Sequence, residues 1–479
     1  MSNPDLKLPG ELRTEVAIIG AGTAGLAAYR AVKASGRTAL LIEGGPYGTT
    51  CARVGCMPSK LLIAPAEAAH ALDRLQGFGL ELEGRVKVDG KAVMARVRSE
   101  RDRFVGFVTR GVEAIPDGDK LRGQARFLDD HTLVVDDRVT VHAGSIVIAT
   151  GSSPTYPAGW KVLGDRLLTN DEIFELDQLP DSVAVFGPGV IGLELGQALH
   201  RLGVRVKVFG RGGGVGPLSD PDLLQEARKI FGAELYLDTD ARAEVARNGD
   251  EVVVSYRALD GSTKVERFSY LLAATGRTAN VAGLALERTS LATDDKGVPL
   301  FNRTTLRCGN SSIFIAGDVN NDVPLLHEAA DEGRIAGENA ASFPEVHDGL
   351  RRAPLSVVFS DPQISIVGGG WGRLKDVPHV TGEVSFVDQG RARIMFRNQG
   401  LLHVYADSRT GLFLGAEMLG PEAEHIGHLL AWALQMKLTI AQMLEMPFYH
   451  PVLEEGLRTA LRDARAKLEI VAGEARRAA

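Results

Sequence analysis

Short apolar runs that end in glycine alternate with segments of helical spacing along the chain. Residues 15–20 (EVAIIG) have the pattern of a buried strand, residues 23–35 that of a helix, and residues 38–43 (TALLIE) that of a second strand. The same order returns in residues 182–187 (SVAVFG), 190–202 and 204–210. Each set forms one βαβ unit, so the pattern predicts two separate nucleotide-binding folds in an α/β protein.

The remaining pattern completes the predicted fold. Residues 89–113 predict a long charged amphipathic helix, and residues 146–151 (IVIATG) predict a strand that closes the first sheet. Residues 271–276 (LLAATG) and 313–318 (IFIAGD) predict buried strands that end in small residues, where α/β sheets place ligands. After Arg351 we expect strands at 384–386 and 401–405 and helices at 423–436 and 454–468. This last region lacks a glycine fingerprint, which predicts a third domain of a different kind.

Composition and charge narrow the function classes. A chain of 479 residues is long enough for about three domains, and 44% hydrophobic with 24% charged residues is typical of a globular protein. The net charge of −7 argues against nucleic acid or an anionic membrane as a partner. The apolar runs are far shorter than the roughly 20 residues of a membrane span. Because the first residues also lack an apolar secretory core, we expect a cytoplasmic protein.

The first βαβ unit has the glycine fingerprint of a dinucleotide site. Gly20, Gly22 and Gly25 lie between the strand and the helix, where a tight turn and close backbone approach let a pyrophosphate reach the helix N-terminus. Glu43 ends the next strand, where its carboxylate can accept the ribose hydroxyls. The alternative is a plain glycine-rich turn, which the flanking strand and Glu43 argue against.

A second fingerprint, Gly187, Gly189 and Gly192, has the same place in the second unit. Two dinucleotide sites on one chain suggest electron passage between two cofactors, typically a flavin and a nicotinamide. Gly210 stands where a second ribose-binding carboxylate is expected. Arg211 follows it, and its guanidinium could pair with the 2′-phosphate of NADP or could be a solvated loop residue.

Two of the three cysteines lie close together and predict redox chemistry. Cys51 and Cys56 are followed by Pro58, which suits the first turn of a helix, so we expect Cys56 at the helix N-terminus, where a thiolate is stabilised. Their separation exceeds one helical turn, so a disulfide between them needs a distorted turn, which Gly55 can supply. The alternative is two buried structural cysteines, the role that we expect for Cys308.

A histidine and a carboxylate open the last predicted helix. Pro451 is expected at its first position, with His450 just outside and Glu455 one turn inside, so that the two side chains can meet. An imidazole with a carboxylate partner is suited to taking a proton from a thiol near neutral pH. Taken alone, His450 could be a surface or capping histidine, and only the cysteine pair gives it a chemical role. We expect no metal site.

Taken together, these motifs resemble the flavin-dependent pyridine nucleotide-disulfide oxidoreductase family (class I), from residue 16 to the C-terminal helix. Residues 51–60 (CARVGCMPSK) are similar to the family's redox motif, residues 313–318 to its second flavin motif, and residues 276–280 (GRTAN) to its GRxPN junction. Residues 190–194 (VIGLE), 326–327 (LH), 332–333 (EG) and 450–455 (HPVLEE) are most similar to the dihydrolipoamide dehydrogenase branch of that family.

The resemblance implies roles for individual residues. Cys51 would exchange with substrate and Cys56 would face the flavin, while Lys60 would pair with Glu194 beside the flavin, and His450 and Glu455 would form the acid/base couple. FAD would be bound by Gly20, Gly22, Gly25, Glu43, Thr50, Lys60, Thr150, Gly151 and Asp318, and NAD(P) by Gly187, Gly189, Gly192, Arg211 and Gly276. Residues 1–154 with 280–350 would form the FAD-binding domain, 155–279 the NAD(P)-binding domain, and 351–479 the dimerisation domain of a homodimer in which His450 enters the partner's site.

The implied activity is the transfer of two electrons between a dithiol/disulfide and NAD(P) through FAD. The favoured dithiol is protein-bound dihydrolipoamide, as on the lipoyl domain of a 2-oxoacid dehydrogenase complex. An NADPH-dependent glutathione-type reductase and a non-catalytic redox-sensing flavoprotein stay open as alternatives. Mercuric reductases and the large thioredoxin reductases are disfavoured because no cysteine follows Cys308, and soluble transhydrogenases because Cys51 is present.

Residues of the redox loop and residues after the second βαβ unit depart from the family pattern. Thr49 and Arg53 replace a glycine and an asparagine of the redox loop. Dihydrolipoamide dehydrogenases favour NAD, whereas Gly210 followed by Arg211 is similar to the NADP-using glutathione reductases, whose second arginine is replaced here by Pro217. We therefore expect dual use of NAD and NADP.

Overall fold

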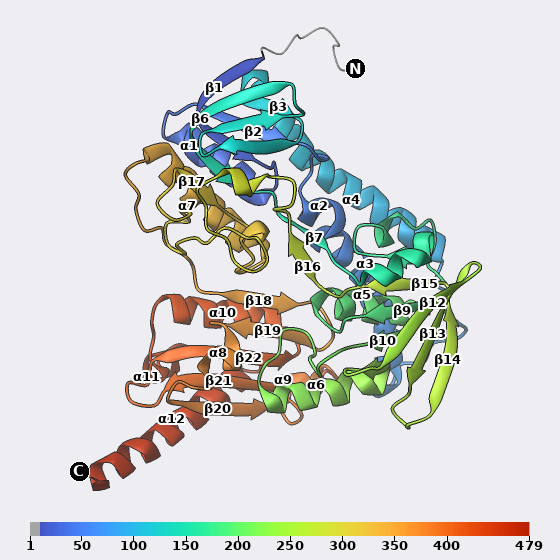
Figure 1. Cartoon of the computed structure of the whole chain (residues 1–479). Helices are drawn as coiled ribbons and strands as arrows, with labels where there is room; N and C mark the ends of the chain where they lie inside the picture. Colours follow the sequence, from blue (N-terminus) through green and yellow to red (C-terminus); the bar gives the residue numbers. More distant parts are fainter. Residues whose placement is uncertain (1–9, 479) are drawn as a thin grey trace. The chain divides into compact units, whose positions relative to one another are not determined.

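The computed structural model describes residues 10–478, which divide into two compact units (Figure 1). Unit 1 contains the described residues up to Met57 together with Ser99–Thr155 and Arg277–Arg352. Unit 2 contains Pro58–Arg98, Tyr156–Gly276 and the described residues from Ala353 onward. The division passes through helices α3 (Cys56–His70) and α4 (Gly90–Glu113). Among residues 10–478, no helix combines the length and apolar character that a bilayer span requires.

Unit 1 is built on a mostly parallel sheet. Its strands are β1 (Glu11–Ile19), β2 (Ala39–Glu43), β3 (Lys120–Arg122), β4 (Ala125–Asp129), β5 (Thr132–Val135), β6 (Val139–Ile148) and β17 (Ile313–Ile315). Their order is β3-β2-β1-β6-β5-β4, and β17 also pairs with β6. β1 runs parallel to both neighbours, with Val16 opposite Ala39 on β2 and Ser145 on β6. This is the topology of a Rossmann-like unit. The central strands are buried because helical residues such as Leu26 pack on one face of the sheet. Residues outside the α-helices, such as Leu284 and Val298, pack on the other face.

Helix α1 (Thr23–Ala34) packs closely on α7 (Leu326–Ser342) in unit 1. A Cβ at Gly333 would lie 2.1 Å from Ala24 O, and one at Gly337 would lie 2.5 Å from Ala28 O, so only glycine allows this approach. The other elements of the unit are α2 (Thr50–Val54), β7 (Ser152–Pro154), β16 (Arg277–Ala279), η2 (Asp117–Asp119), η5 (Leu286–Arg288) and η6 (Asp318–Asn320).

The first part of unit 2 repeats the strand–helix–strand pattern. Its parallel sheet contains β8 (Leu167–Leu168), β9 (Ser182–Phe186), β10 (Arg205–Phe209), β11 (Tyr236–Asp238) and β15 (Tyr270–Ala273), in the order β11-β10-β9-β15-β8. The helices of this part are η1 (Ala71–Phe78), η3 (Ala158–Arg166), η4 (Ile173–Glu175), α5 (Val190–Arg201) and α6 (Pro221–Glu234). The sequence pattern did not predict the separate antiparallel sheet of β12 (Ala243–Asn248), β13 (Glu251–Arg257) and β14 (Thr263–Phe268).

The C-terminal part of unit 2 is an antiparallel sheet covered by helices. Its strands are β18 (Leu355–Val358), β19 (Gln363–Val367), β20 (His379–Ser385), β21 (Leu401–Asp407) and β22 (Phe413–Gly420), in the order β18-β19-β22-β21-β20. The helices are α8 (Gly370–Leu374), α9 (Gly390–Ile394), α10 (Ala423–Gln435), α11 (Ile440–Leu444) and α12 (Glu454–Ala478). α12 lies against β20 so closely that a Cβ at Gly382 would be 2.2 Å from Ala460 O.

A buried ion network joins α5 to the C-terminal part of unit 2. Asp361 Oδ2 lies 3.0 Å from the Arg201 guanidinium, and Asp361 Oδ1 lies 3.2 Å from that of Arg397. Arg201 also pairs with Glu234 on α6 at 2.6 Å. Because the Arg201 side chain is only 5% exposed, these carboxylates take the place of water in stabilising its positive charge.

The predicted mixed α/β class, with two Rossmann-like units and a C-terminal part of mixed helix and strand, is confirmed, and two local expectations are corrected. Residues 146–151 were expected to close the first sheet, but β6 lies inside it because β17 pairs with its last residues and β5 with its first. The last helix was expected to end at Leu468, but α12 continues to Ala478. The added residues are mostly Ala, Glu and Arg, which favour helix.

Candidate active site and nucleotide-binding sites

The first glycine fingerprint joins β1 to α1, and its three glycines have different tasks. Gly20 has a φ of +108°, and a Cβ there would lie 2.3 Å from Ala149 O. A Cβ at Gly25 would lie 1.8 Å from Gly20 O, so α1 can approach the turn only without a side chain. Gly22 is the N-cap of α1, and a Cβ there would meet nothing within 4 Å. This open space before the N–H groups of α1 fits a pyrophosphate.

Glu43, the last residue of β2, holds its carboxylate beside the fingerprint. Its Oε2 accepts a hydrogen bond from Ala21 N–H at 2.7 Å, and its Oε1 accepts one from Gly45 N–H at 2.6 Å. A carboxylate has about four acceptor positions, so the fixed group can still accept the hydroxyls of a ribose.

Three other predicted flavin residues, Thr150, Gly151 and Asp318, belong to one hydrogen-bonded cluster in unit 1. Asp318 begins η6, and its Oδ2 accepts from Ser152 Oγ at 3.0 Å. Arg277 Nε donates to the same Ser152 Oγ at 2.8 Å. Asn280 N–H donates to Gly151 O at 2.9 Å, and Thr150 Oγ1 donates to Asn280 O at 2.8 Å. Sequence reasoning missed Ser152, which connects the GRxPN-like segment to the aspartate.

A buried carboxylate that sequence reasoning gave no role supports the turn before Asp318. Glu332 Oε2 accepts from Gly317 N–H and from Asn320 Nδ2, both at 2.7 Å, and Oε1 lies 2.8 Å from the Arg351 guanidinium. Burial raises the pKa of Glu332 to about 7 against the opposing effects of these partners. The only sequence signal was its place in the Glu332-Gly333 pair that resembles the family.

The second fingerprint repeats the geometry of the first between β9 and α5. Gly187 has a φ of +107°, and a Cβ there would lie 2.2 Å from Ala274 O. A Cβ at Gly192 would lie 1.8 Å from Gly187 O, whereas one at Gly189 would meet nothing within 4 Å. Gly276, at a φ of +120°, also has a backbone that favours glycine. A second dinucleotide pyrophosphate therefore fits at the N-terminus of α5.

The cysteine pair lies where two helices meet. α2 ends at Val54 and α3 begins at Cys56, so the chain is interrupted at Gly55, where a Cβ would lie 3.1 Å from Cys51 Cα. The break between the helices places Cys56 at the N-terminus of α3, where a thiolate is stabilised. Cys56 is exposed and Cys51 half-buried. Cys308 is fully buried, which raises the pKa of its thiol to about 12 and fits a structural role.

The two unusual residues of the redox loop have visible local roles. Thr49 has a φ of +58°, a conformation that favours the glycine found in the family, and its Oγ1 accepts from Ala52 N–H at 3.3 Å. Thr49 therefore caps α2, in which the predicted FAD contact Thr50 is exposed. The Cγ and Cδ of Arg53 lie 3.1 Å from the position that a Cβ of Gly48 would take, so the arginine stem packs on that glycine.

Lys60, one turn after Cys56, forms a buried ion pair. Its Nζ donates to both carboxylate oxygens of Glu194, at 2.9 and 2.7 Å. Glu194 is on α5 with only 4% of its side chain exposed, whereas Lys60 is 33% exposed. Phe359 N–H donates to Glu194 Oε1 at 3.0 Å, and the Phe359 ring centroid lies 4.5 Å from Nζ. The predicted pairing of Lys60 with Glu194 is thus present in unit 2.

His450 and Glu455 meet as the sequence predicts, but by a different local structure. His450 Nδ1 lies 2.9 Å from Glu455 Oε2, and the His450 side chain is 81% exposed. α12 begins at Glu454, so Pro451 precedes the helix instead of occupying its first position. Glu455 Oε2 also accepts from Val452 N–H at 3.4 Å, which ties the residues before α12 to its first turn. Burial raises the pKa of Glu455, but this N–H and the imidazole lower it more.

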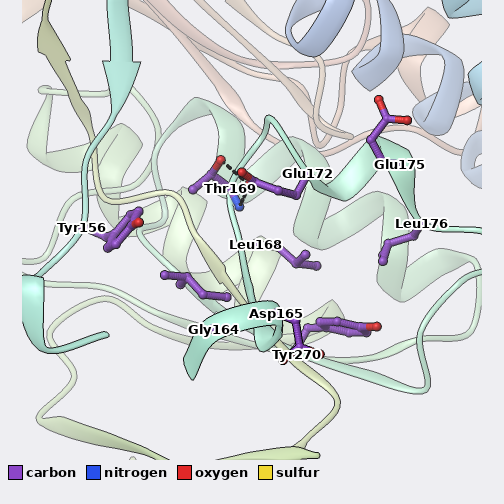
Figure 2. Close-up of a pocket in the computed structure, with 10 residues that line it drawn as sticks. Tyr156, Gly164, Asp165, Leu168, Thr169, Glu172, Glu175, Leu176 and Tyr270 are labelled. Atoms are coloured by element: carbon purple, nitrogen blue, oxygen red, sulfur yellow. Dashed lines mark hydrogen bonds between the residues drawn. The ribbon is translucent and has the colours of Figure 1, made fainter. Parts of the chain in front are cut away.

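A hollow of about 500 Å³ in unit 2 is lined by none of the predicted site residues (Figure 2). Its lining is Tyr156, Gly164, Asp165, Leu167, Leu168, Thr169, Glu172, Glu175, Leu176 and Tyr270. Glu172 Oε2 accepts from both the N–H and the hydroxyl of Thr169 at 2.7 Å, as the dashed lines in Figure 2 show. Asp165 pairs with Arg247 at 2.7 Å. Glu172 and Asp165 therefore have local structural partners, and we assign the hollow no chemistry.

Within the described part of unit 2, two groups of acidic and histidine side chains have ligand atoms close enough to share an ion: Asp220 with Asp222 and His403, and Glu422 with Glu424 and His425. The contacts of the first group have a structural explanation. Asp220 Oδ1 accepts from the N–H groups of Asp222 and Leu223 and so caps α6. Its Oδ2 lies 2.8 Å from His403 Nδ1 and accepts from Tyr405 OH at 2.9 Å. The aspartate thus ties α6 to β21.

The predicted site residues are divided between the two units. Unit 1 contains the cysteine pair and every predicted FAD residue except Lys60. Unit 2 contains Lys60, Glu194, His450, Glu455 and the predicted NAD(P) residues, with Arg211 exposed in the loop after β10.

Family models and known proteins match most of the chain. Residues 14–333 match the family model described as pyridine nucleotide-disulphide oxidoreductase, and residues 355–461 match the dimerisation domain of that family. The chain is 30% identical over 467 residues to the dihydrolipoyl dehydrogenase of Haloferax volcanii, covering 94% of this chain and 96% of that protein. It is 31% identical over 465 residues to the mercuric reductase of Streptomyces lividans, covering 93% and 95%.

Among solved structures, LpdA of Mycobacterium tuberculosis matches with a TM-score of 0.80 at 26% identity, over 94% of this chain and 99% of that chain. Enzymes of the matched family depend on FAD and use NAD(P), and the match to its dimerisation domain supports a homodimer. The chain therefore belongs to the pyridine nucleotide-disulphide oxidoreductase family.

Proposed function

We propose that this protein moves two electrons between a dithiol and NAD(P), with protein-bound dihydrolipoamide as the physiological dithiol. The observation that supports this best is the junction of α2 and α3, where Gly55 lets the chain turn back on Cys51 and Cys56 begins α3. A thiolate at a helix N-terminus is stabilised, so Cys56 is the better leaving group of the two, and attack on Cys51 Sγ is favoured for that reason.

The described residues fit both proposed cofactors. Gly22 leaves space before α1, and Glu43 has a fixed carboxylate for a ribose, so this end of unit 1 fits FAD. Gly189 leaves the same space before α5 for NAD(P). When bound, FAD would supply a two-electron relay between the reduced cysteines and the pyridine nucleotide.

The thiol chemistry belongs to the side chains of the protein. His450, oriented by Glu455, takes the proton of one substrate thiol, and the resulting thiolate attacks Cys51 Sγ. The Cys51–Cys56 bond breaks, and Cys56 leaves as a thiolate with the electron pair. The second substrate thiol then attacks the mixed disulfide, which releases oxidised lipoamide and leaves both cysteines reduced. His450 would come from the partner chain, which requires a homodimer.

We also propose that both NAD(H) and NADP(H) are used. A carboxylate at position 210 would repel a 2′-phosphate, but a Cβ there would lie 2.7 Å from Pro188 Cγ and 2.8 Å from Thr239 O. A proline ring and a backbone carbonyl cannot move aside easily, so the site has no room for such a side chain. Arg211 follows directly, and a guanidinium favours a phosphate. These features also support the rival, an NADPH-dependent glutathione-type reductase.

A substrate screen tests this proposal. The FAD-loaded protein should reduce NAD⁺ with dihydrolipoamide and should turn over lipoamide faster than glutathione disulfide with either reduced nucleotide. Faster turnover of glutathione disulfide would favour the rival. We also propose a cytoplasmic location, because a dithiol substrate stays reduced in that compartment.

Serine variants provide the matched control for that screen. Cys51→Ser and Cys56→Ser should each lose disulfide turnover by at least about a thousandfold, because no disulfide can form between the two positions. Both should keep FAD through gel filtration, since the fingerprint and Asp318 are unchanged. Near-normal lipoamide activity of Cys56→Ser would refute the mechanism.

A further inference from the structure

The loop after β10 is fastened beside the second glycine fingerprint. Gly216 N–H donates to Pro188 O at 2.7 Å, and Pro188 stands between the first two glycines of that fingerprint. On its other side the loop is held by Gly213 N–H, which donates to Thr239 O at 2.9 Å, and by Gly212 N–H, which donates to Asp240 Oδ1 at 2.9 Å. The loop backbone is therefore fixed where the adenosine ribose of a nucleotide is expected.

A second guanidinium lies on this loop, supplied by α6. Arg228 Nε donates to Gly213 O at 3.1 Å, and its Nη2 donates to the same oxygen. A Cβ at Gly213 would lie 3.0 Å from Nη2, so the glycine leaves the guanidinium room to lie across the loop. Within the described residues, neither Arg228 nor Arg211 forms an ion pair with a carboxylate, and both are exposed. Two positive charges thus stand at the loop without a structural counter-ion.

We propose that Arg228 is a specificity residue for the 2′-phosphate of NADP(H) and acts together with Arg211. Two of its five N–H donors are used by Gly213 O, and three stay available for phosphate oxygens. Asp240 is exposed on the adjacent turn, and its negative charge repels a bound anion. The two positive charges of Arg228 and Arg211 exceed this single negative charge. Arg228 takes the part of the second loop arginine that Pro217 replaces. This inference rests on the proposed use of pyridine nucleotides.

Binding of nucleotide fragments to the FAD-loaded protein tests the role of Arg228 without any disulfide chemistry. Adenosine 2′,5′-bisphosphate contains the 2′-phosphate and 5′-AMP lacks it, and calorimetry measures both. Arg228→Ala should weaken binding of the bisphosphate about tenfold, as expected for the loss of a charge-assisted contact at an exposed site. The affinity for 5′-AMP should change by less than about twofold. Arg211→Ala should behave alike. Lys229→Ala is the matched control, because Lys229 has the same charge on the same helix but pairs with Glu226 and should change neither ligand.

The ratio of the two affinities separates phosphate recognition from loop support. If Arg228 only holds the loop, Arg228→Ala will weaken both ligands equally, and that result overturns the inference. An unchanged affinity for the bisphosphate overturns it as well. If the wild-type protein fails in the lipoamide assay but Arg228→Ala selectively loses affinity for the bisphosphate, the proposed substrate is refuted and this inference stands. If the wild-type protein binds both fragments with equal affinity, the inference itself is refuted.

Discussion

Replacing Lys60 by methionine tests the buried pair that it forms with Glu194. Methionine keeps the length of the side chain and removes its charge. Glu194 then loses two hydrogen bonds, at 2.9 and 2.7 Å, and keeps only the one from Phe359 N–H. With 4% of its side chain exposed, Glu194 cannot be hydrated in exchange. The variant therefore contains a buried carboxylate without a counter-ion.

The size of the effect follows from the unequal burial of the two partners. Breaking a fully buried pair costs about 3–5 kcal/mol. Because Lys60 is 33% exposed, we place Lys60→Met at the lower end, about 3 kcal/mol, or roughly a 150-fold change in the folded to unfolded ratio. Glu194→Gln should cost only about 1 kcal/mol, because the amide oxygen still accepts from Phe359 N–H and water can reach the lysine.

Urea unfolding of the dimer, at fixed protein concentration and with excess FAD, measures these differences. The double variant Lys60→Met with Glu194→Gln should be more stable than Lys60→Met alone, since it contains no buried charge. Equal costs for the two single changes, or a double variant whose cost is their sum, would refute the explanation. Either result would mean that the pair behaves like an exposed one, in which each partner is hydrated separately.

Other changes probe the dimer, the buried ion network and the nucleotide loop. Dimers refolded from equal amounts of Cys51→Ser and His450→Gln chains, each inactive alone, should regain about a quarter of wild-type activity. Half of these dimers are mixed, and each mixed dimer has one intact site of two. No recovery in verified mixed dimers would show that each site is built by one chain. Asp361→Asn should lower stability by about 2 kcal/mol at pH 7. Burial raises the pKa of Asp361, but its two arginine partners lower it more. The stabilisation by Asp361 is therefore present above the unfolded pKa of 3.8 and is lost as the pH falls through the folded pKa. A difference in urea midpoint between wild type and Asp361→Asn that does not shrink at pH 3 would contradict this. Asp240→Asn should tighten binding of adenosine 2′,5′-bisphosphate about twofold and leave 5′-AMP unchanged, because it removes a like charge; equal effects on both ligands in calorimetry would count against it.

The local features of the fold could be predicted from the sequence because they depend on near neighbours in the chain. Helix α1 (Thr23–Ala34) begins and ends within one residue of its predicted limits, since Gly20 and Gly22 before it dictate the turn. The position of Cys56 at the start of α3 could be predicted too, because Pro58 suits the first turn of a helix. His450 and Glu455 meet because five residues across a turn are enough to bring them together.

The tertiary structure decided what depends on segments far apart. The sequence shows that Gly210 is not a carboxylate, but only the fold shows that Pro188 and Thr239 leave no room for one. Arg228 lies 17 residues after Arg211 and reaches the same loop because α6 packs back beside it. Ser152 binds Asp318 across 166 residues. No local pattern specifies such pairs, since their distance is set by the packing of whole elements, and that packing results from many side chains at once.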